Sequence, residues 1–301
     1  MIIRIISGII GILVAAVVIQ LGGAVFAIFA ALLSLIGWHE YSNAMGKKGI
    51  STTYIIGALM LVLMLGCAWI GNIAELVAVL TIGTLLIFLM TVILYGNIRP
   101  TDACASAAGV LYIGLPLAHL ILLRFISPEQ LSNQLNNLNS ITSIDSSLVG
   151  INIGEALNTL TNLNFDVGSA LIWTLFICTW SSDTFAYFVG TAIGSHKLAS
   201  AISPKKTIEG FIGSIVGTTA MAILIGHVLF SFPLIEMAVI GFLMSIFATL
   251  GDLVESVIKR FVGIKDSGMM LPGHGGMLDR FDSIFYTAPI FYYCVIIFGL
   301  I

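Results

Sequence analysis

Nine long apolar windows are the feature that most constrains how this chain can fold. They lie at 2–20, 22–38, 53–71, 74–95, 104–125, 169–190, 208–230, 235–258 and 281–301. Each is about as long as an α-helix that crosses a hydrocarbon layer roughly 30 Å thick. The windows are apolar runs, whereas the strands of a membrane barrel alternate apolar and polar residues. The sequence therefore predicts an all-α polytopic membrane protein with about nine transmembrane helices.

Composition supports a membrane protein and excludes other classes. Hydrophobic residues make up 58% of the chain and charged residues 9%, and the mean hydropathy of +1.09 is far outside the range of soluble domains. A net charge of −3 lacks the basic footprint of a nucleic-acid-binding protein, so no nucleic-acid partner is expected. The four scattered cysteines are expected to be small core residues instead of zinc ligands or disulfides. The sequence leaves open whether the chain forms a homo-oligomer.

Lysines and arginines indicate the orientation of the helices, because positive residues gather on the cytoplasmic side of membranes. With the N-terminus in the cytoplasm, eleven of the twelve lie on or near that side: Arg4, Lys47, Lys48, Arg99, Lys197, Lys205, Lys206, Lys259, Arg260, Lys265 and Arg280. Only Arg124 falls outside. Nine helices then place the C-terminus on the external side. The compact chain suits a bacterial plasma membrane, with its polar motifs facing the cytoplasm.

Three regions follow one another along the chain. Residues 1–126 are expected to be a scaffold of N-terminal transmembrane helices, and residues 127–168 an external polar loop without Lys or Arg. Residues 169–301 are the expected catalytic transmembrane region, in which nine charged side chains fall between Asp252 and Asp282. No repeat relates the two halves, which disfavours an inverted-repeat transporter.

The first polar cluster is WSSDTFAYFVG, residues 180–190, at the cytoplasmic end of the sixth window. A carboxylate within an apolar helix costs a few kcal/mol by insertion scales. Asp183 is therefore expected to face the protein interior or a water-filled cavity, either as a structural polar partner or as a functional group.

The second cluster is SPKKTIEG, residues 203–210, where the seventh window begins. Ser203 is the expected N-cap, with Pro204 in the first helical turn. Lys205 and Lys206 would then lie at a helix N-terminus, which already favours an anion. A phosphate site and simple anchoring at the membrane surface are both open interpretations.

The third cluster begins with GDLVESVIKR, residues 251–260. If the eighth helix continues through it, four polar residues share one face: Asp252, Glu255, Ser256 and Lys259. A solvated face with intrahelical ion pairs would look the same. The segment that follows favours a functional interpretation.

That segment is KDSGMMLPGHGGMLDRFD, residues 265–282. Its glycines permit tight turns and close backbone approach to a ligand, and the ninth helix then presents Asp279 and Asp282 one turn apart. Two acidic faces joined by a glycine-rich loop with cations suggest Mg²⁺ and a polyphosphate, because Mg²⁺ prefers carboxylate and phosphate oxygens. His274 could be a ligand or a hydrogen-bonding loop residue.

These residues resemble the signature of the phosphatidate cytidylyltransferase family, also called CDP-diacylglycerol synthases. The matching positions are Ser256, Lys259, Arg260, Lys265, Asp266, Gly268, Leu271, Pro272, His274, Gly275, Gly276, Asp279, Arg280 and Asp282, with no departure. The segments around Asp183 and 203–210 are also similar to the family. The resemblance covers about 180–283 strongly and the first 130 residues only by hydropathy.

The resemblance implies that CTP and phosphatidic acid react to give CDP-diacylglycerol and pyrophosphate, with Mg²⁺ as cofactor. The implied metal ligands are Asp252, Asp279, Asp282 and Asp183, with Asp266 as a further candidate. The implied catalytic residues are Lys259, Arg260, Lys265, Asp266 and Arg280. The implied substrate-binding residues are Lys205, Lys206, Ser256, His274, Gly275 and Gly276.

Three alternatives remain open from the sequence. In a transporter or channel, Asp183, Asp252 and Asp279 would line an ion path. A polyprenol kinase would use CTP but transfer its γ-phosphoryl group. A noncatalytic helical bundle would use the loop only to dock partners, which the density of phosphate-suited residues disfavours.

Overall fold

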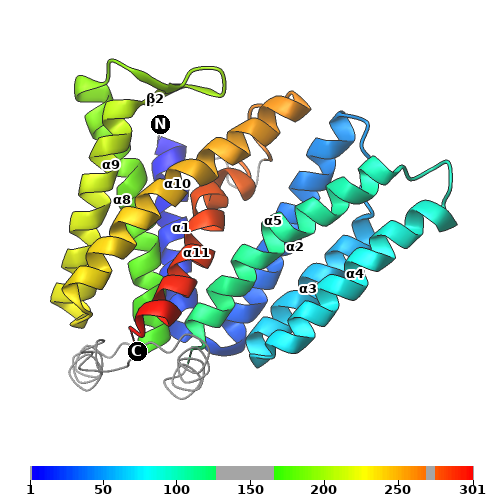
Figure 1. The fold of residues 1–301 in the computed structure, drawn as a ribbon, viewed down its shortest axis with the longest axis horizontal. Coiled ribbons are helices and arrows are strands. Elements are labelled where there is room, and N and C mark those ends of the chain that lie inside the picture. Colours follow the sequence, from blue (N-terminus) through cyan, green and yellow to red (C-terminus); the bar gives the residue numbers. More distant parts are fainter. Residues whose placement is uncertain (1, 127–165, 269–274, 301) are drawn as a thin grey trace, which may run out of the picture. The chain divides into compact units, whose positions relative to one another are not determined.

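The computed structural model describes residues 2–126, 166–268 and 275–300, which are nearly all helical (Figure 1). The elements are α1 (Ile2–Leu21), α2 (Gly23–Lys47), α3 (Tyr54–Ile70), α4 (Ile73–Ile93), α5 (Pro100–Arg124), α8 (Val167–Ile193), β1 (Lys197–Ala199), β2 (Ser203–Thr207), α9 (Ile208–Ala222), the π-helical segment η2 (Ile223–Leu229), α10 (Leu234–Val262) and α11 (Leu278–Phe298). Most of the predicted external loop, 127–165, lies outside the described residues.

The predicted class of helical membrane protein is confirmed, since every apolar window coincides with a helix. Six helical stretches in the described residues are long and apolar enough to cross a membrane: α2, α4, α5, α9 with η2, α10 and α11. Two further apolar helices, Gly8–Leu21 and Tyr54–Ile70, are shorter. The predicted boundary of the second window at residue 38 is wrong, because α2 continues to Lys47.

A short hairpin outside the apolar windows departs from the all-α prediction. β1 and β2 are antiparallel, with Lys197 opposite Thr207 and Ala199 opposite Ser203. The predicted N-cap at Ser203 is also wrong: Thr207 caps α9, and its Oγ1 accepts a hydrogen bond from Gly210 N at 3.2 Å. Pro204 fits because both strands of a two-stranded sheet are edge strands, where its missing N–H is tolerated.

The chain divides into two units, and the first comprises Met1–Leu122 and Val254–Phe285. Trp38 on α2 lies at its core with 0% exposure, and its Nε1 donates to Tyr54 O at 2.9 Å. Tyr41 stacks on Trp38 and donates its hydroxyl to Ala105 O at 2.9 Å. The polar end of α2 is therefore helical because its side chains find partners inside the unit.

A tight turn joins α3 to α4 in this unit. Gly71 ends α3 with φ of 78°, a left-handed conformation that glycine adopts without strain. Asn72 then caps α4, and its side chain accepts a hydrogen bond from Glu75 N at 3.2 Å. The adjacent helices therefore form an antiparallel hairpin.

The second unit comprises Leu123–Leu253 and Tyr286–Ile301. Glycines let α8 and α9 pack closely: a Cβ on Gly213 would lie 2.5 Å from the Val189 side chain, and one on Gly217 would lie 2.2 Å from Phe185. Small residues serve this purpose in membrane helix pairs. Arg124 at the end of α5 pairs with Asp166 through two contacts of 2.8 and 3.0 Å, which ties the start of α8 to α5.

Packing around Trp38 predicts that two glycines of α3 respond differently to alanine. A Cβ on Gly57 would lie 2.2 Å from the Trp38 ring, whereas a Cβ on Gly66 has no atom within 4 Å. Gly57→Ala is expected to cost about 1–3 kcal/mol of stability through overpacking. Gly66→Ala is expected to be neutral or to stabilise by up to about 1 kcal/mol through helix propensity. Thermal unfolding of both variants in detergent measures the difference, and equal melting temperatures would contradict the packing.

Candidate active site

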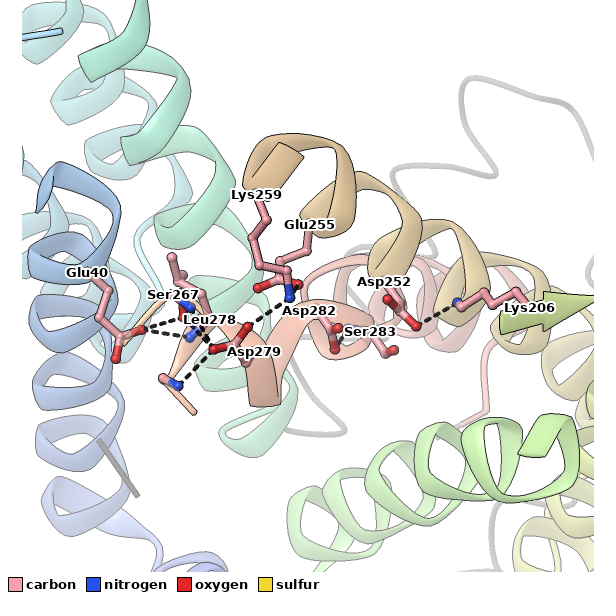
Figure 2. Close-up of polar contacts among 11 residues, drawn as sticks. Glu40, Lys206, Asp252, Glu255, Lys259, Ser267, Leu278, Asp279, Asp282 and Ser283 are labelled. Carbon is pink, nitrogen blue, oxygen red and sulfur yellow. Dashed lines mark hydrogen bonds and ion pairs between the residues drawn. The ribbon is translucent and has the colours of Figure 1, made fainter. Parts of the chain in front are cut away.

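The first candidate cluster joins the end of α10 to the start of α11 within the first unit (Figure 2). The Lys259 ammonium contacts the Glu255 carboxylate one turn earlier and donates to Asp279 Oδ1 at 2.8 Å. The side chains of Lys259, Glu255 and Asp279 are 18%, 3% and 7% exposed. One ammonium group therefore bridges two carboxylates that are nearly removed from water, where charge interactions are strong.

The other oxygen of Asp279 binds described residues at the two ends of the glycine-rich loop. Asp279 Oδ2 accepts hydrogen bonds from Ser267 N at 2.8 Å, Ser267 Oγ at 2.9 Å and Gly276 N at 2.8 Å. Gly275 has φ of +85°, and a Cβ there would lie 2.7 Å from Asp279 Oδ2. Asp279 thus connects residues on both sides of the loop, and glycine is required where the backbone approaches its carboxylate.

The other predicted site residues of the first unit are close to this cluster in sequence. Asp282 follows Asp279 by one turn, and its Oδ1 accepts a hydrogen bond from Ser283 N at 2.6 Å. Ser256 is half-buried. Four candidates are exposed: Arg260, Lys265, Asp266 and Arg280. Exposed cations of this kind can meet a soluble polyphosphate without a large desolvation cost. His274 lies outside the described residues.

A second cluster lies in the other unit. Lys206 Nζ pairs with Asp252 Oδ2 at 2.6 Å and also lies 3.4 Å from Thr249 O. Lys205 is exposed, and as its neighbour on β2 it points to the opposite side of the strand. Both lysines therefore lie in a strand before α9, not in its first turn as the sequence predicted. Asp183 is exposed on α8, which excludes a place in the packed interior.

Sequence reasoning missed three polar residues that hold the first cluster together. Ser267 bonds Asp279, and Glu255 bonds Lys259 but was recognised only as part of a helix face. Glu40 on α2 accepts a hydrogen bond from Met277 N at 2.9 Å, just before α11. A carboxylate near the end of an apolar window is itself a signal for function, and Glu40 escaped because the window was ended at residue 38.

The donor set fits Mg²⁺ in chemical type. Within the described residues, no group of three or more His, Cys, Asp or Glu side chains forms a ready ligand set. Mg²⁺ commonly binds only one or two protein carboxylates together with substrate phosphates. Glu255 Oε1 is buried without a hydrogen-bond partner in the described part of the chain, which suits a cation. Asp279 and Asp252 each hold a lysine, so a metal at either carboxylate would have to displace an ammonium group.

The helices and these carboxylate and ammonium clusters define an integral membrane protein with groups suited to phosphate. The sequence profile of the Cytidylyltransferase family matches residues 2–298, and the chain belongs to that family. A phosphatidate cytidylyltransferase of Synechocystis sp. is 33% identical over 304 residues, covering 98% of this chain and 96% of the relative. One of Staphylococcus haemolyticus is 31% identical over 293 residues and 96% of each chain. One of Bacillus subtilis is 44% identical over 133 residues, 44% of this chain and 49% of the relative.

The contacts of Asp279 predict the effect of replacing it with asparagine. Asp279→Asn keeps the size of the side chain, but removes the negative charge that faces Lys259 and places an NH₂ group among N–H donors. We expect turnover to fall about a hundredfold, the order seen when one electrostatic contact of a reacting site is removed, while the protein still assembles in the membrane. Turnover per folded molecule is measured beside Glu75→Gln, an exposed control on α4. Turnover like that of the unmodified protein would refute the expectation that Asp279 contributes to catalysis.

Proposed function

We propose that this chain transfers the cytidylyl group of CTP to phosphatidic acid, which yields CDP-diacylglycerol and pyrophosphate for phospholipid synthesis. The observation that carries the proposal is the match to phosphatidate cytidylyltransferases over nearly the whole chain. The buried Lys259–Asp279 contact and the loop held by Asp279 support it, because both lie within the segment that resembles the family signature.

The chemistry requires little covalent participation by the protein. An oxygen of the ionised phosphatidate attacks the α-phosphorus of CTP, and the bond from that phosphorus to the oxygen bridging the β-phosphate breaks. Pyrophosphate leaves with the electron pair. Catalysis of such a displacement rests on positioning and on neutralising charge. In this proposal four cations hold the triphosphate and the departing pyrophosphate: Lys259, Arg260, Lys265 and Arg280.

The remaining residues orient the two substrates. Lys205 and Lys206 meet either the nucleotide phosphates or the lipid headgroup. Ser256, His274 and Gly275 donate hydrogen bonds to phosphate oxygens, whereas the N–H of Gly276 donates to Asp279 and this glycine supports substrate binding through that contact. Asp266 is exposed and follows Lys265 in the sequence. It is a further carboxylate that takes part in catalysis in this proposal.

Magnesium is the proposed cofactor. The candidate ligands are Asp279 and Asp282 in the first unit and Asp252 and Asp183 in the second, and bound Mg²⁺ would neutralise charge on the triphosphate. The chain's own contribution is to keep carboxylates near neutralising lysines, so that the site bears no large excess charge before substrate arrives. The close contacts of Lys259 with Asp279 and of Lys206 with Asp252 support this role.

We further propose nine membrane spans, with the N-terminus and active site in the cytoplasm and the C-terminus outside a bacterial plasma membrane. The distribution of lysines and arginines supports this orientation. Residues 1–126 would be the scaffold, 127–168 the external loop and 169–301 the catalytic region. Homo-oligomerisation is compatible with this proposal and is tested by light scattering of the purified protein.

The direct test supplies detergent-purified protein with phosphatidic acid, α-labelled CTP and Mg²⁺, followed by extraction of the lipid. We expect label in the lipid that requires phosphatidic acid and disappears when EDTA removes the divalent metal. Labelled lipid in the presence of EDTA would refute the metal requirement. No labelled lipid from folded protein would contradict the reaction, and a phosphorylated alcohol formed with release of CDP would indicate a kinase.

A matched pair of lysine variants tests the role of the hairpin. Lys206→Gln removes the ammonium that pairs with Asp252, whereas Lys197→Gln removes an exposed charge from β1. Because charge-assisted contacts to phosphates and carboxylates are worth about 1.5–3 kcal/mol, we expect Lys206→Gln to lower kcat/KM at least about tenfold. Lys197→Gln should change it little. Equal losses in the two variants would mean that the hairpin acts only through its overall charge.

A further inference from the structure

Glu40 is a buried carboxylate of α2 that meets the start of α11 within the first unit (Figure 2). It is 6% exposed. Its Oε1 accepts a hydrogen bond from Met277 N at 2.9 Å, and its Oε2 accepts from Leu278 N at 3.1 Å and from Ser267 Oγ at 3.1 Å. Glu40 therefore contacts both the entry to the glycine-rich loop and the residues that lead into α11.

These contacts explain how the protein tolerates a buried carboxylate at this position. The first N–H groups of a helix have no partner within the helix, and the helix dipole favours negative charge there. Glu40 satisfies two such groups from another helix, so that α11 receives its cap from α2. Among the described residues Glu40 makes no ion pair, and backbone and hydroxyl donors alone compensate its charge.

Two glycines show how closely the loop packs against this carboxylate. A Cβ on Gly268 would lie 2.3 Å from Glu40 Oε1. A Cβ on Gly276 would lie 2.4 Å from Glu40 Oε2 and 2.3 Å from Ser267 Oγ. The absence of a side chain at both positions thus allows the backbone to approach Glu40, which is a structural reason for glycine at these positions.

Glu40 also reaches Asp279 through a shared partner. The Ser267 hydroxyl lies 3.1 Å from Glu40 Oε2 and 2.9 Å from Asp279 Oδ2. A hydroxyl has one proton and can donate to only one carboxylate at a time. Together the two carboxylates hold the backbone of Ser267, Gly276, Met277 and Leu278, which sets the position from which α11 presents Asp279.

We propose that Glu40 is a positioning residue for cytidylyl transfer, which acts by fixing Ser267, Met277 and the first turn of α11 so that Asp279 holds Lys259 in one geometry toward the substrate phosphates. The proposal rests on the proposed function. A misplacement of about 1 Å can lower turnover about a hundredfold, so loss of Glu40 affects kcat even where the fold persists.

The test compares Glu40→Gln and Glu40→Asp with the exposed control Glu75→Gln in the labelled-CTP assay. Glutamine keeps the size but opposes an NH₂ group to a backbone N–H, whereas aspartate keeps the charge and is one methylene shorter. We expect kcat per folded molecule to fall about tenfold or more in Glu40→Gln, and less in Glu40→Asp. The KM for phosphatidic acid should stay within about twofold, since ground-state lipid binding is not removed.

The outcomes separate this inference from the reaction itself. If the unmodified protein and Glu75→Gln label no lipid, the proposed function fails. If both are active and Glu40→Gln keeps the unmodified kcat per folded molecule, the positioning role is overturned. A lower melting temperature with unchanged kcat would show a structural role only, and would also overturn it.

A double-mutant cycle with Gly268→Ala provides a second measurement. The added methyl group collides with the Glu40 carboxylate, so its effect on kcat should depend on which residue occupies position 40. We expect Gly268→Ala to lower kcat at least about tenfold in the unmodified protein and less in the Glu40→Asp background, where the shorter side chain leaves room. Equal effects in both backgrounds would show that the loop does not depend on Glu40.

Discussion

The arrangement of the candidate site depends on two carboxylates buried beside the start of α11. Asp279 and Glu40 are 7% and 6% exposed, and buried charge is costly unless hydrogen bonds and opposite charge compensate it. Lys259 and the backbone N–H groups of the loop supply that compensation. The same contacts hold the glycine-rich loop and join it to α2 and α10. The stability of the first unit and the geometry of the proposed site therefore depend on the same contacts.

These contacts suit a reaction in which the protein neutralises the charge of the substrates and positions them. Phosphatidate already carries its nucleophilic oxygen, so the task is to hold two polyanionic substrates in line. In the proposed mechanism, lysines placed against carboxylates serve this task, because an incoming phosphate or cation exchanges partners with them instead of meeting unpaired charge. Lys259 with Asp279 and Lys206 with Asp252 are two such pairs, one in each unit. Membership of the Cytidylyltransferase family agrees with this chemistry.

Much of the fold is predictable because membrane helices are read from long apolar runs, and α10 does continue through residues 251–260, the condition for the shared polar face. Sequence signals for the position of a helix cap are less decisive. Ser203 and Thr207 are both suitable N-caps, and only the pairing of β2 with β1 selects Thr207. Glu40 was missed because hydropathy treats a glutamate as the end of a span. Contacts such as Glu40 with Leu278, 238 positions apart, depend on tertiary packing that periodicity does not encode.

The carboxylates at the start of α11 hold Ser267 and Gly276 at the two ends of the glycine-rich loop, and amide hydrogen exchange tests this most directly. The measurement compares exchange in peptides that cover residues 260–285 between the unmodified protein and Asp279→Asn. We expect faster exchange in the variant at Ser267 and Gly276, whose N–H groups donate to Asp279, with the core of α3 unchanged. Equal protection of these amides in both proteins would show that the loop is held by other contacts, and would contradict the account.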